Sequence, residues 1–136
     1  MIKSIEINES NYKDYCSLDI AAFSFAEPGA MGMPGGIEII DTQGQCYYTN
    51  YCHGHNWIKF EHLMEIIPVL KDGEIFGPQV PAGWKTVYLG AGNHLAIKSD
   101  YYSQFEKEAH NRGIEKPVEY FKQWFEIMLE LLGKTV

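Results

Sequence analysis

Residues 27–60 place the strongest constraint on how this chain can fold, because they encode a β-hairpin. Residues 37–41 and 45–52 are short runs rich in β-branched and aromatic side chains, which favour strands. The loop between them, 42–44, ends in Gly44, and a glycine there suits the bulged turn of a three-residue hairpin loop. A hairpin at this point predicts a sheet in which neighbouring strands are mostly antiparallel.

Further strands are predicted on both sides of this hairpin. Alternation predicts a short strand over residues 2–8, and an apolar run predicts a central strand over 18–26. A second hairpin is predicted over 86–98, since two apolar runs flank a glycine-rich turn at 90–93. The segment 71–85 is rich in glycine and proline, so we expect it to be irregular and more mobile than the hairpins.

Three helices are predicted from apolar residues spaced three and four apart. The first begins at Phe60 and is limited by Pro68. For the second, Ser99 is the expected N-cap and Gly113 the expected stop. The third runs from Pro117 to Gly133. Its apolar stripe is expected to be buried, on the sheet or against a second copy of the chain in a homodimer, and it comprises Val118, Phe121, Trp124, Phe125, Met128 and Leu132.

The order of these elements predicts that residues 1–136 form one α+β domain. We expect a mostly antiparallel sheet built from hairpins, with the two C-terminal helices packed on one face. The chain is long enough to bury a core without disulfides or metal. Its three cysteines are too few and odd in number for a disulfide framework, which fits a reducing compartment. Because no signal peptide or membrane-spanning run is visible, the prediction is a cytoplasmic protein without membrane association.

The charge balance narrows the range of partners. The net charge is −7, from 18 acidic and 11 basic residues, and the basic residues are scattered. A nucleic-acid binder needs clustered lysine and arginine, so the balance argues against nucleic acid as a partner. An acidic chain is compatible with a basic protein partner, although the charge is also what ordinary solubility requires.

Histidines following the first hairpin are the candidates for metal chemistry. His53 and His55 are separated by one glycine, so in extended backbone they lie on one side about 7 Å apart. With His94, or alternatively His62, as third ligand they could hold Zn²⁺ with an open position for an activated water. The simpler interpretation is that these are loop histidines bonded to backbone groups. Cys46 and Cys52 are about 20 Å apart along a strand and cannot share an ion.

Three functional hypotheses follow. The first is a non-enzymatic protein-binding module, comparable in size and charge to an immunity protein or inhibitor that masks a basic toxin. Its candidate binding residues are His53, His55, Trp57, Trp84 and His94. The second is a small metal-assisted hydrolase using His53, His55 and His94. The third is a small-ligand pocket between the sheet and a glycine- and proline-rich loop. Trp124 is predicted to lie in the core, as are the small thiols of Cys16 and Cys46.

Overall fold

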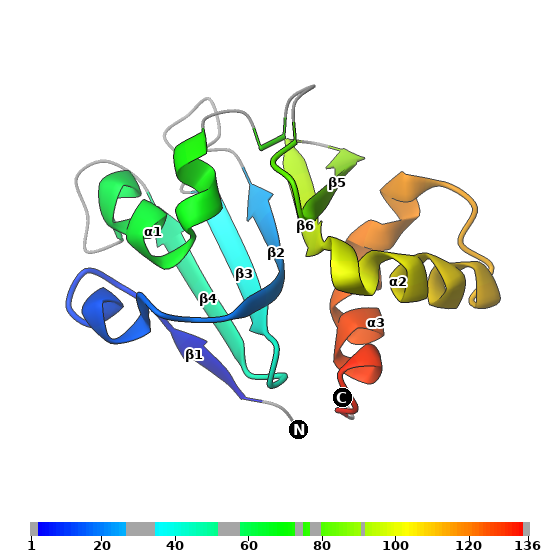
Figure 1. The fold of residues 1–136 in the computed structure, drawn as a ribbon, viewed down its shortest axis with the longest axis horizontal. Helices are drawn as coiled ribbons and strands as arrows, with labels where there is room; N and C mark the ends of the chain where they lie inside the picture. Colours follow the sequence, from blue (N-terminus) through cyan, green and yellow to red (C-terminus); the bar gives the residue numbers. More distant parts are fainter. Residues whose placement is uncertain are drawn as a thin grey trace.

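The computed structural model describes residues 3–26, 35–51, 58–72, 75–76, 80–90 and 92–134 of the chain. Its centre is a six-stranded sheet with the strand order β1-β4-β3-β2-β6-β5 (Figure 1). The strands are β1 (Ser4–Glu6), β2 (Ile20–Ala26), β3 (Gly35–Asp41), β4 (Cys46–Tyr51), β5 (Trp84–Gly90) and β6 (Asn93–Lys98). Strand β1 pairs with β4 in parallel, and the other four pairings are antiparallel. The predicted α+β class is confirmed.

Helices cover both faces of this sheet. The α-helices are α1 (Phe60–Ile66), α2 (Ser99–Asn111) and α3 (Trp124–Leu131), and the 3-10 helices are η1 (Tyr12–Tyr15), η2 (Pro68–Asp72) and η3 (Pro117–Lys122). The two C-terminal α-helices pack on one face, as predicted, while η1, α1 and η2 pack on the other. Among the described helices, none is long and apolar enough to cross a bilayer.

The first hairpin has the turn that its sequence predicts. Gly44 has a φ of +83°, and the Asp41 amide donates to the Gln45 carbonyl oxygen over 3.0 Å. The Asp41 carboxylate closes the turn by accepting hydrogen bonds from the amides of Gln43 (2.9 Å) and Gln45 (3.0 Å). Its other oxygen accepts a 2.8 Å hydrogen bond from the hydroxyl of Tyr47, which is buried. This side chain therefore fixes the register of β3 against β4.

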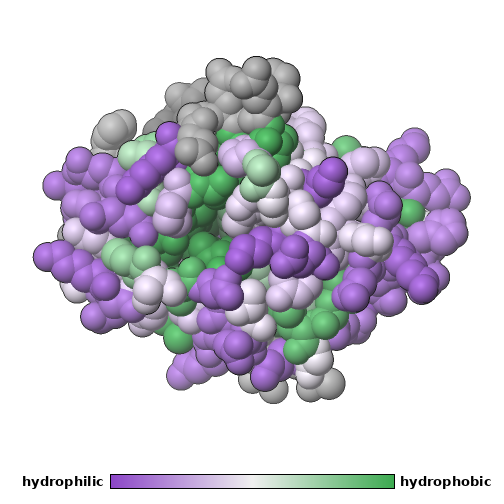
Figure 2. Space-filling view, viewed as in Figure 1, coloured by the Kyte–Doolittle hydropathy of each residue, from purple (hydrophilic) through white to green (hydrophobic). Residues whose placement is uncertain are grey.

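The sheet divides the hydrophobic core into two clusters. One lies under α2 and α3 and is built around Phe105, Trp124 and Met128. The other lies under α1 and is built around Phe23 and Leu63. Figure 2, in the same orientation as Figure 1, shows the α1 side hollowed over the middle of the sheet, with hydrophobic side chains lining the hollow. The predicted position of Trp124 in the core is confirmed.

The prediction of one continuous last helix is wrong, because this part of the chain forms two segments that meet at Gln123. The φ of Gln123 is −121°, which is outside helical geometry, so η3 ends there and α3 begins anew. A 3-10 helix has three residues per turn, which places Val118 and Phe121 on one side. That side faces away from the core, and both residues are 52% exposed, contrary to the predicted buried stripe. Tyr120 is the residue of this segment that packs inward.

Two smaller predictions also need correction. Ser99 is the first residue of α2 and not its N-cap; the capping position belongs to Lys98, which makes no side-chain capping bond. Cys16 is exposed, whereas Cys46 is buried as expected. The predicted stop at Gly113 is confirmed, since its φ is +80° and the following amide donates to the Ala109 carbonyl oxygen.

Candidate functional site

The face of the sheet that carries α2 and α3 is covered at one end only. Side chains on this face form rows across the strands, because paired residues point to the same side. One row is completely buried and comprises Ile97, Ala22, Ile40 and Cys46. The next row lies two residues further along each strand and comprises Leu95, Ser24, Glu38 and Tyr48. Along β3 and β4, the covering helices therefore end between these two rows.

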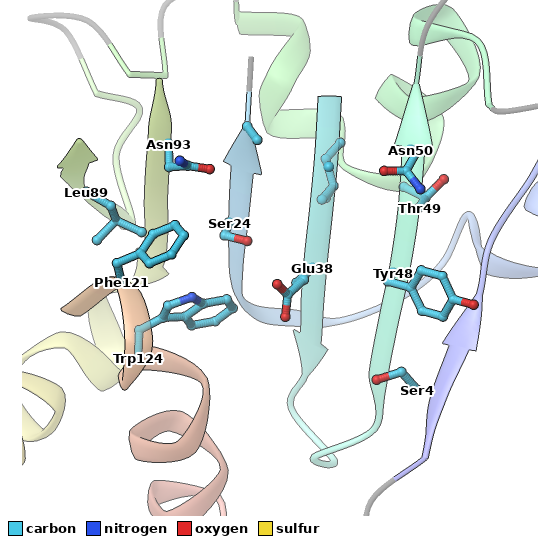
Figure 3. A pocket seen from close by; sticks show the side chains of 13 residues that line it. Ser4, Ser24, Glu38, Tyr48, Thr49, Asn50, Leu89, Asn93, Phe121 and Trp124 are labelled. Atoms are coloured by element: carbon cyan, nitrogen blue, oxygen red, sulfur yellow. The ribbon is translucent and has the colours of Figure 1, made fainter. Parts of the chain in front are cut away.

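The uncovered end forms a groove of about 530 Å³. In Figure 3 the strands β2, β3 and β4 make its floor, and Phe121 and Trp124 stand on one side. Trp124 is buried, while Phe121 and Tyr48 are exposed. The residues whose side chains give the groove its character are Ser4, Ser24, Glu38, Tyr48, Asn50, Asn93, Phe121 and Trp124. Hydroxyl and amide groups on the floor are thus combined with aromatic rings at the sides.

Small residues leave space above the floor. Ala26 and Gly36 occupy the groove ends of β2 and β3. A methyl group added at Gly36 would meet the side-chain oxygen of Asn50 at 3.6 Å, an ordinary van der Waals contact. The depth of the groove here comes from the absence of large side chains and not from a strained backbone.

Glu38 gives the groove its electrostatic character. Among the described residues that line the groove, it carries the only charge. Its side chain is exposed on the groove side, and in Figure 3 the carboxyl group points from β3 towards the side where Trp124 lies. The groove walls still remove part of its water, which raises the pKa of Glu38 above the ordinary value. No residue in the described part of the chain donates a hydrogen bond or supplies an opposite charge to this carboxylate.

A smaller hollow adjoins the groove above η3. It measures about 480 Å³ and shares Leu89, Asn93 and Phe121 with the groove. The exposed side chain of Val118 also lines it. The groove and this hollow share residues, so the exposed apolar side chains of Val118 and Phe121 lie next to the polar groups over the sheet.

Two of the sequence-predicted site residues, Trp84 and His94, lie together on the opposite face of the sheet. The ring of Trp84 meets Phe23 edge-on at 5.5 Å, and the His94 ring stacks on Phe76 at 4.6 Å. Phe23 and Phe76 are themselves in edge contact at 6.1 Å. This aromatic cluster packs the α1 side of the sheet and takes no part in the groove.

The other three predicted site residues, His53, His55 and Trp57, lie outside the described residues, so the proposed metal trio is not tested. Within the described ranges, no three histidine, cysteine, aspartate or glutamate side chains meet in a way that could hold a metal ion. The Cys46 thiol faces the covered end of the sheet, where burial raises its pKa to about 11. A thiol with that pKa is almost entirely protonated at neutral pH and makes a poor nucleophile.

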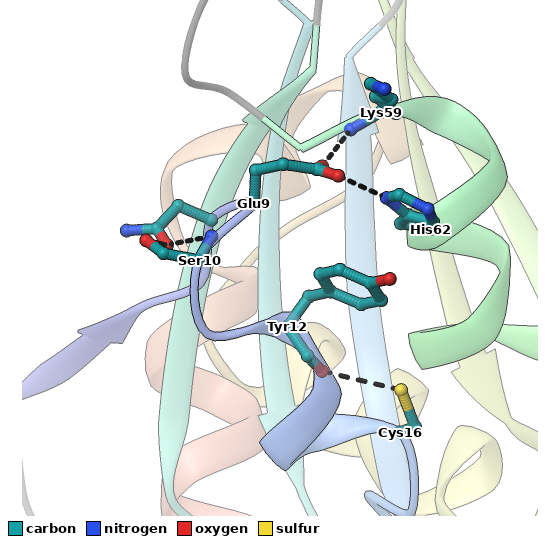
Figure 4. Close-up of polar contacts among 7 residues, drawn as sticks. Glu9, Ser10, Tyr12, Cys16, Lys59 and His62 are labelled. Carbon is teal, nitrogen blue, oxygen red and sulfur yellow. Dashed lines mark hydrogen bonds and ion pairs between the residues drawn. The ribbon is translucent and has the colours of Figure 1, made fainter.

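His62, the alternative third ligand of the predicted metal site, makes contacts within the fold that Figure 4 shows. Its Nδ1 lies 2.5 Å from Oε1 of Glu9, although the ring nitrogen lacks the geometry of a directed hydrogen bond. The second oxygen of Glu9 accepts a 3.0 Å hydrogen bond from the Lys59 amide at the start of α1. The His62 ring also stacks on Tyr12 at 4.3 Å. This group therefore fastens the N-terminal segment to α1.

The sequence analysis missed the groove residues because they come together only through the strand order. A signal was nevertheless present in each strand. Ser24 interrupts the apolar run of β2, and Glu38 stands between isoleucines in β3. A single polar residue in one strand does not indicate a site, but the register of the sheet places Ser24 and Glu38 side by side. Comparisons with protein-family models, with curated proteins and with solved structures give no match to this chain.

Proposed function

We propose that this chain is a non-enzymatic protein-binding module for a basic partner, and that the groove and the adjoining surface of η3 form its contact face. The observation that carries the proposal is the Glu38 carboxylate, which has no counter-charge among the described residues and lies in a groove with aromatic sides. Tyrosine and tryptophan are common anchors of protein interfaces.

The overall charge supports the same partner. At a net charge of −7 the chain attracts a basic protein over a distance, and this attraction raises the association rate. Val118 and Phe121 add exposed apolar contact area beside the groove. The surface thus offers apolar contacts next to a negative centre, as expected for an interface whose affinity comes from burial and whose specificity comes from charge.

Site-specific cross-linking tests this proposal. A photoreactive phenylalanine analogue is placed at Tyr48 in the groove or, as a matched control, at the exposed Tyr88 of β5, which lies beside His94 on the other face of the sheet; the captured proteins are identified by mass spectrometry. We expect Tyr48 alone to capture a partner with a basic isoelectric point. The purified partner is then bound at low and high salt, and the affinity should fall as salt screens the charges.

Two results would contradict the proposal. One is an acidic or neutral partner whose affinity does not change with salt. The other is equal capture of the same partner from Tyr48 and Tyr88, which would place the interface elsewhere. Either outcome would leave the groove as a surface feature without a role in recognition.

Metal-assisted hydrolysis by His53, His55 and His94 stays a second hypothesis, motivated by the His-Gly-His spacing of the sequence. Elemental analysis of protein purified without a histidine tag tests it directly. The hypothesis requires a stoichiometric transition metal that is lost in the His53→Ala variant. Metal-free protein that does not take up Zn²⁺ on titration would exclude this function.

A further inference from the structure

We propose that the groove receives an arginine side chain of the basic partner, with its guanidinium group held at the Glu38 carboxylate, beside Phe121 and the part of Trp124 that lines the groove. This inference rests on the proposed function, which it makes specific. It assigns Glu38 as the counter-charge and the aromatic rings as the surfaces that flank the bound cation.

The first argument is that Glu38 lies in a groove and is partly desolvated, yet it lacks the basic neighbour that several other carboxylates of the chain have. Glu108, Glu126 and Glu130 all contact Arg112 where α2 meets α3. Asp19 is 2.6 Å from Lys98. Each of these acids has a basic neighbour within the molecule, whereas Glu38 has no such partner in the part of the chain that the structure describes. A partly desolvated carboxylate without a counter-charge is stabilised by a cation supplied from outside.

The second argument concerns which cation fits. A guanidinium group is planar and carries five N–H donors, so it can bond a carboxylate and further oxygen acceptors at once while its face stacks on an aromatic ring. The floor places the hydroxyl of Ser24 beside Glu38, because the two residues are paired across β2 and β3. Tyr48 is paired with Glu38 from the other side, on β4. Lysine, with its compact ammonium group, would use fewer of these acceptors.

The third argument is the surrounding space and charge. A volume of about 530 Å³ is within the range of sites that take small ligands, and it leaves room for residues flanking the arginine. Among the described residues that line the groove or the hollow above η3, the only basic one is Lys122, and it lines the hollow and not the groove. Glu119 lines the same hollow, so the two charges there offset each other.

The test uses small probes and NMR spectroscopy. Acetyl-arginine amide is titrated into ¹⁵N-labelled protein, in parallel with acetyl-citrulline amide, its neutral isostere, and acetyl-lysine amide. We expect the arginine probe to shift the backbone amides of Ser24, Glu38 and Tyr48. Its affinity should exceed that of citrulline by about tenfold or more, as a charge-assisted hydrogen bond requires. The lysine probe should bind the same residues more weakly.

Two variants complete the design. Glu38→Gln should lower the affinity for the arginine probe by about tenfold. Glu61→Gln changes the net charge equally, but Glu61 is an exposed residue of α1 on the other side of the sheet, so this variant should bind like the wild type. Unchanged signals from Phe105 and Met128 in both variants would show that the core under α2 and α3 is intact.

The inference is overturned if citrulline binds as well as arginine, if lysine binds better, or if the shifts fall outside the groove. It is also overturned if Glu38→Gln retains full affinity for the arginine probe. These outcomes do not test the proposed function. That function is contradicted independently if cross-linking from Tyr48 captures no basic partner. If a basic partner binds at the groove equally well after Glu38→Gln, the proposed binding function is supported and the proposed arginine site is excluded.

Discussion

The two ends of one sheet face, under α3 and beyond it, use the same strands for opposite purposes. At the covered end, Ile40 and Cys46 are completely buried under the C-terminal helices. Two residues further along the same strands, Glu38 and Tyr48 face the groove. Alternation along a strand determines which residues share a face, but it does not determine where the cover of that face ends. That limit is set by the covering helix.

The length of α3 explains where the cover of this sheet face ends. Eight residues of α-helix span about 12 Å. The seven residues of β3 extend over about 23 Å, so a helix of that size covers only part of the strand. Because the chain breaks at Gln123, the preceding segment η3 packs on β5 and not over β3 and β4. The groove is therefore a consequence of the interruption between η3 and α3.

The largest expected difference between the two ends is in stability. Phe105, on the inner side of α2, is fully buried and meets Tyr120 edge-on at 5.1 Å, so Phe105→Ala should destabilise the protein by about 3–5 kcal/mol. Tyr48→Ala, at the open end, should cost less than about 1 kcal/mol. Urea unfolding of the two variants measures this. If the free energies of unfolding fell equally, the groove would be part of the core and the comparison would fail.

A smaller difference is expected between the two ends of the first hairpin. Asp41 accepts three hydrogen bonds, one of them from the Tyr47 hydroxyl. Burial and, after it, this hydrogen bond raise the pKa of Tyr47 above its ordinary value. Asp41→Ala leaves the Tyr47 hydroxyl without this partner, so we expect a loss of about 2–3 kcal/mol. Asn50→Ala, at the groove end of β4, should change stability by less than about 0.5 kcal/mol. Equal losses in urea unfolding would contradict the proposed role of Asp41 in the turn.

The sequence could predict the covered end of this face but not the open end. The hairpin around Gly44, the central strand and the burial of Trp124 follow from local patterns, and the structure has all three. The spacing of Val118 and Phe121 also fits an α-helix and therefore predicts a buried stripe, and the sequence gives no sign of the break at Gln123. The groove depends on that break and on the strand order, which are both tertiary properties.

The pH dependence of stability provides the finest test of the comparison, because Glu38 should slightly destabilise the free protein. Its pKa is raised by desolvation from the ordinary value of 4.5, so the folded state holds this proton more tightly than the unfolded state. The protonated Glu38 side chain therefore contributes stability to the fold at pH values below 4.5. This contribution is lost as the pH rises from 4.5 through the raised pKa of the folded state, and it is absent at higher pH. Removing the charge by Glu38→Gln should consequently stabilise the protein at neutral pH.

We expect the gain in Glu38→Gln to be below about 0.5 kcal/mol, since the carboxylate is still partly hydrated. Unfolding free energies of the variant and the wild type, measured by urea at pH values from about 7 down to about 4, should converge as Glu38 becomes protonated. The variant Glu61→Gln serves as the control for net charge and should show no such convergence. A variant less stable than the wild type at neutral pH would mean that Glu38 has a favourable partner within the fold. In that case the charge at the open end would be compensated internally, as Lys98 compensates Asp19, and would have no need of a cation from a partner.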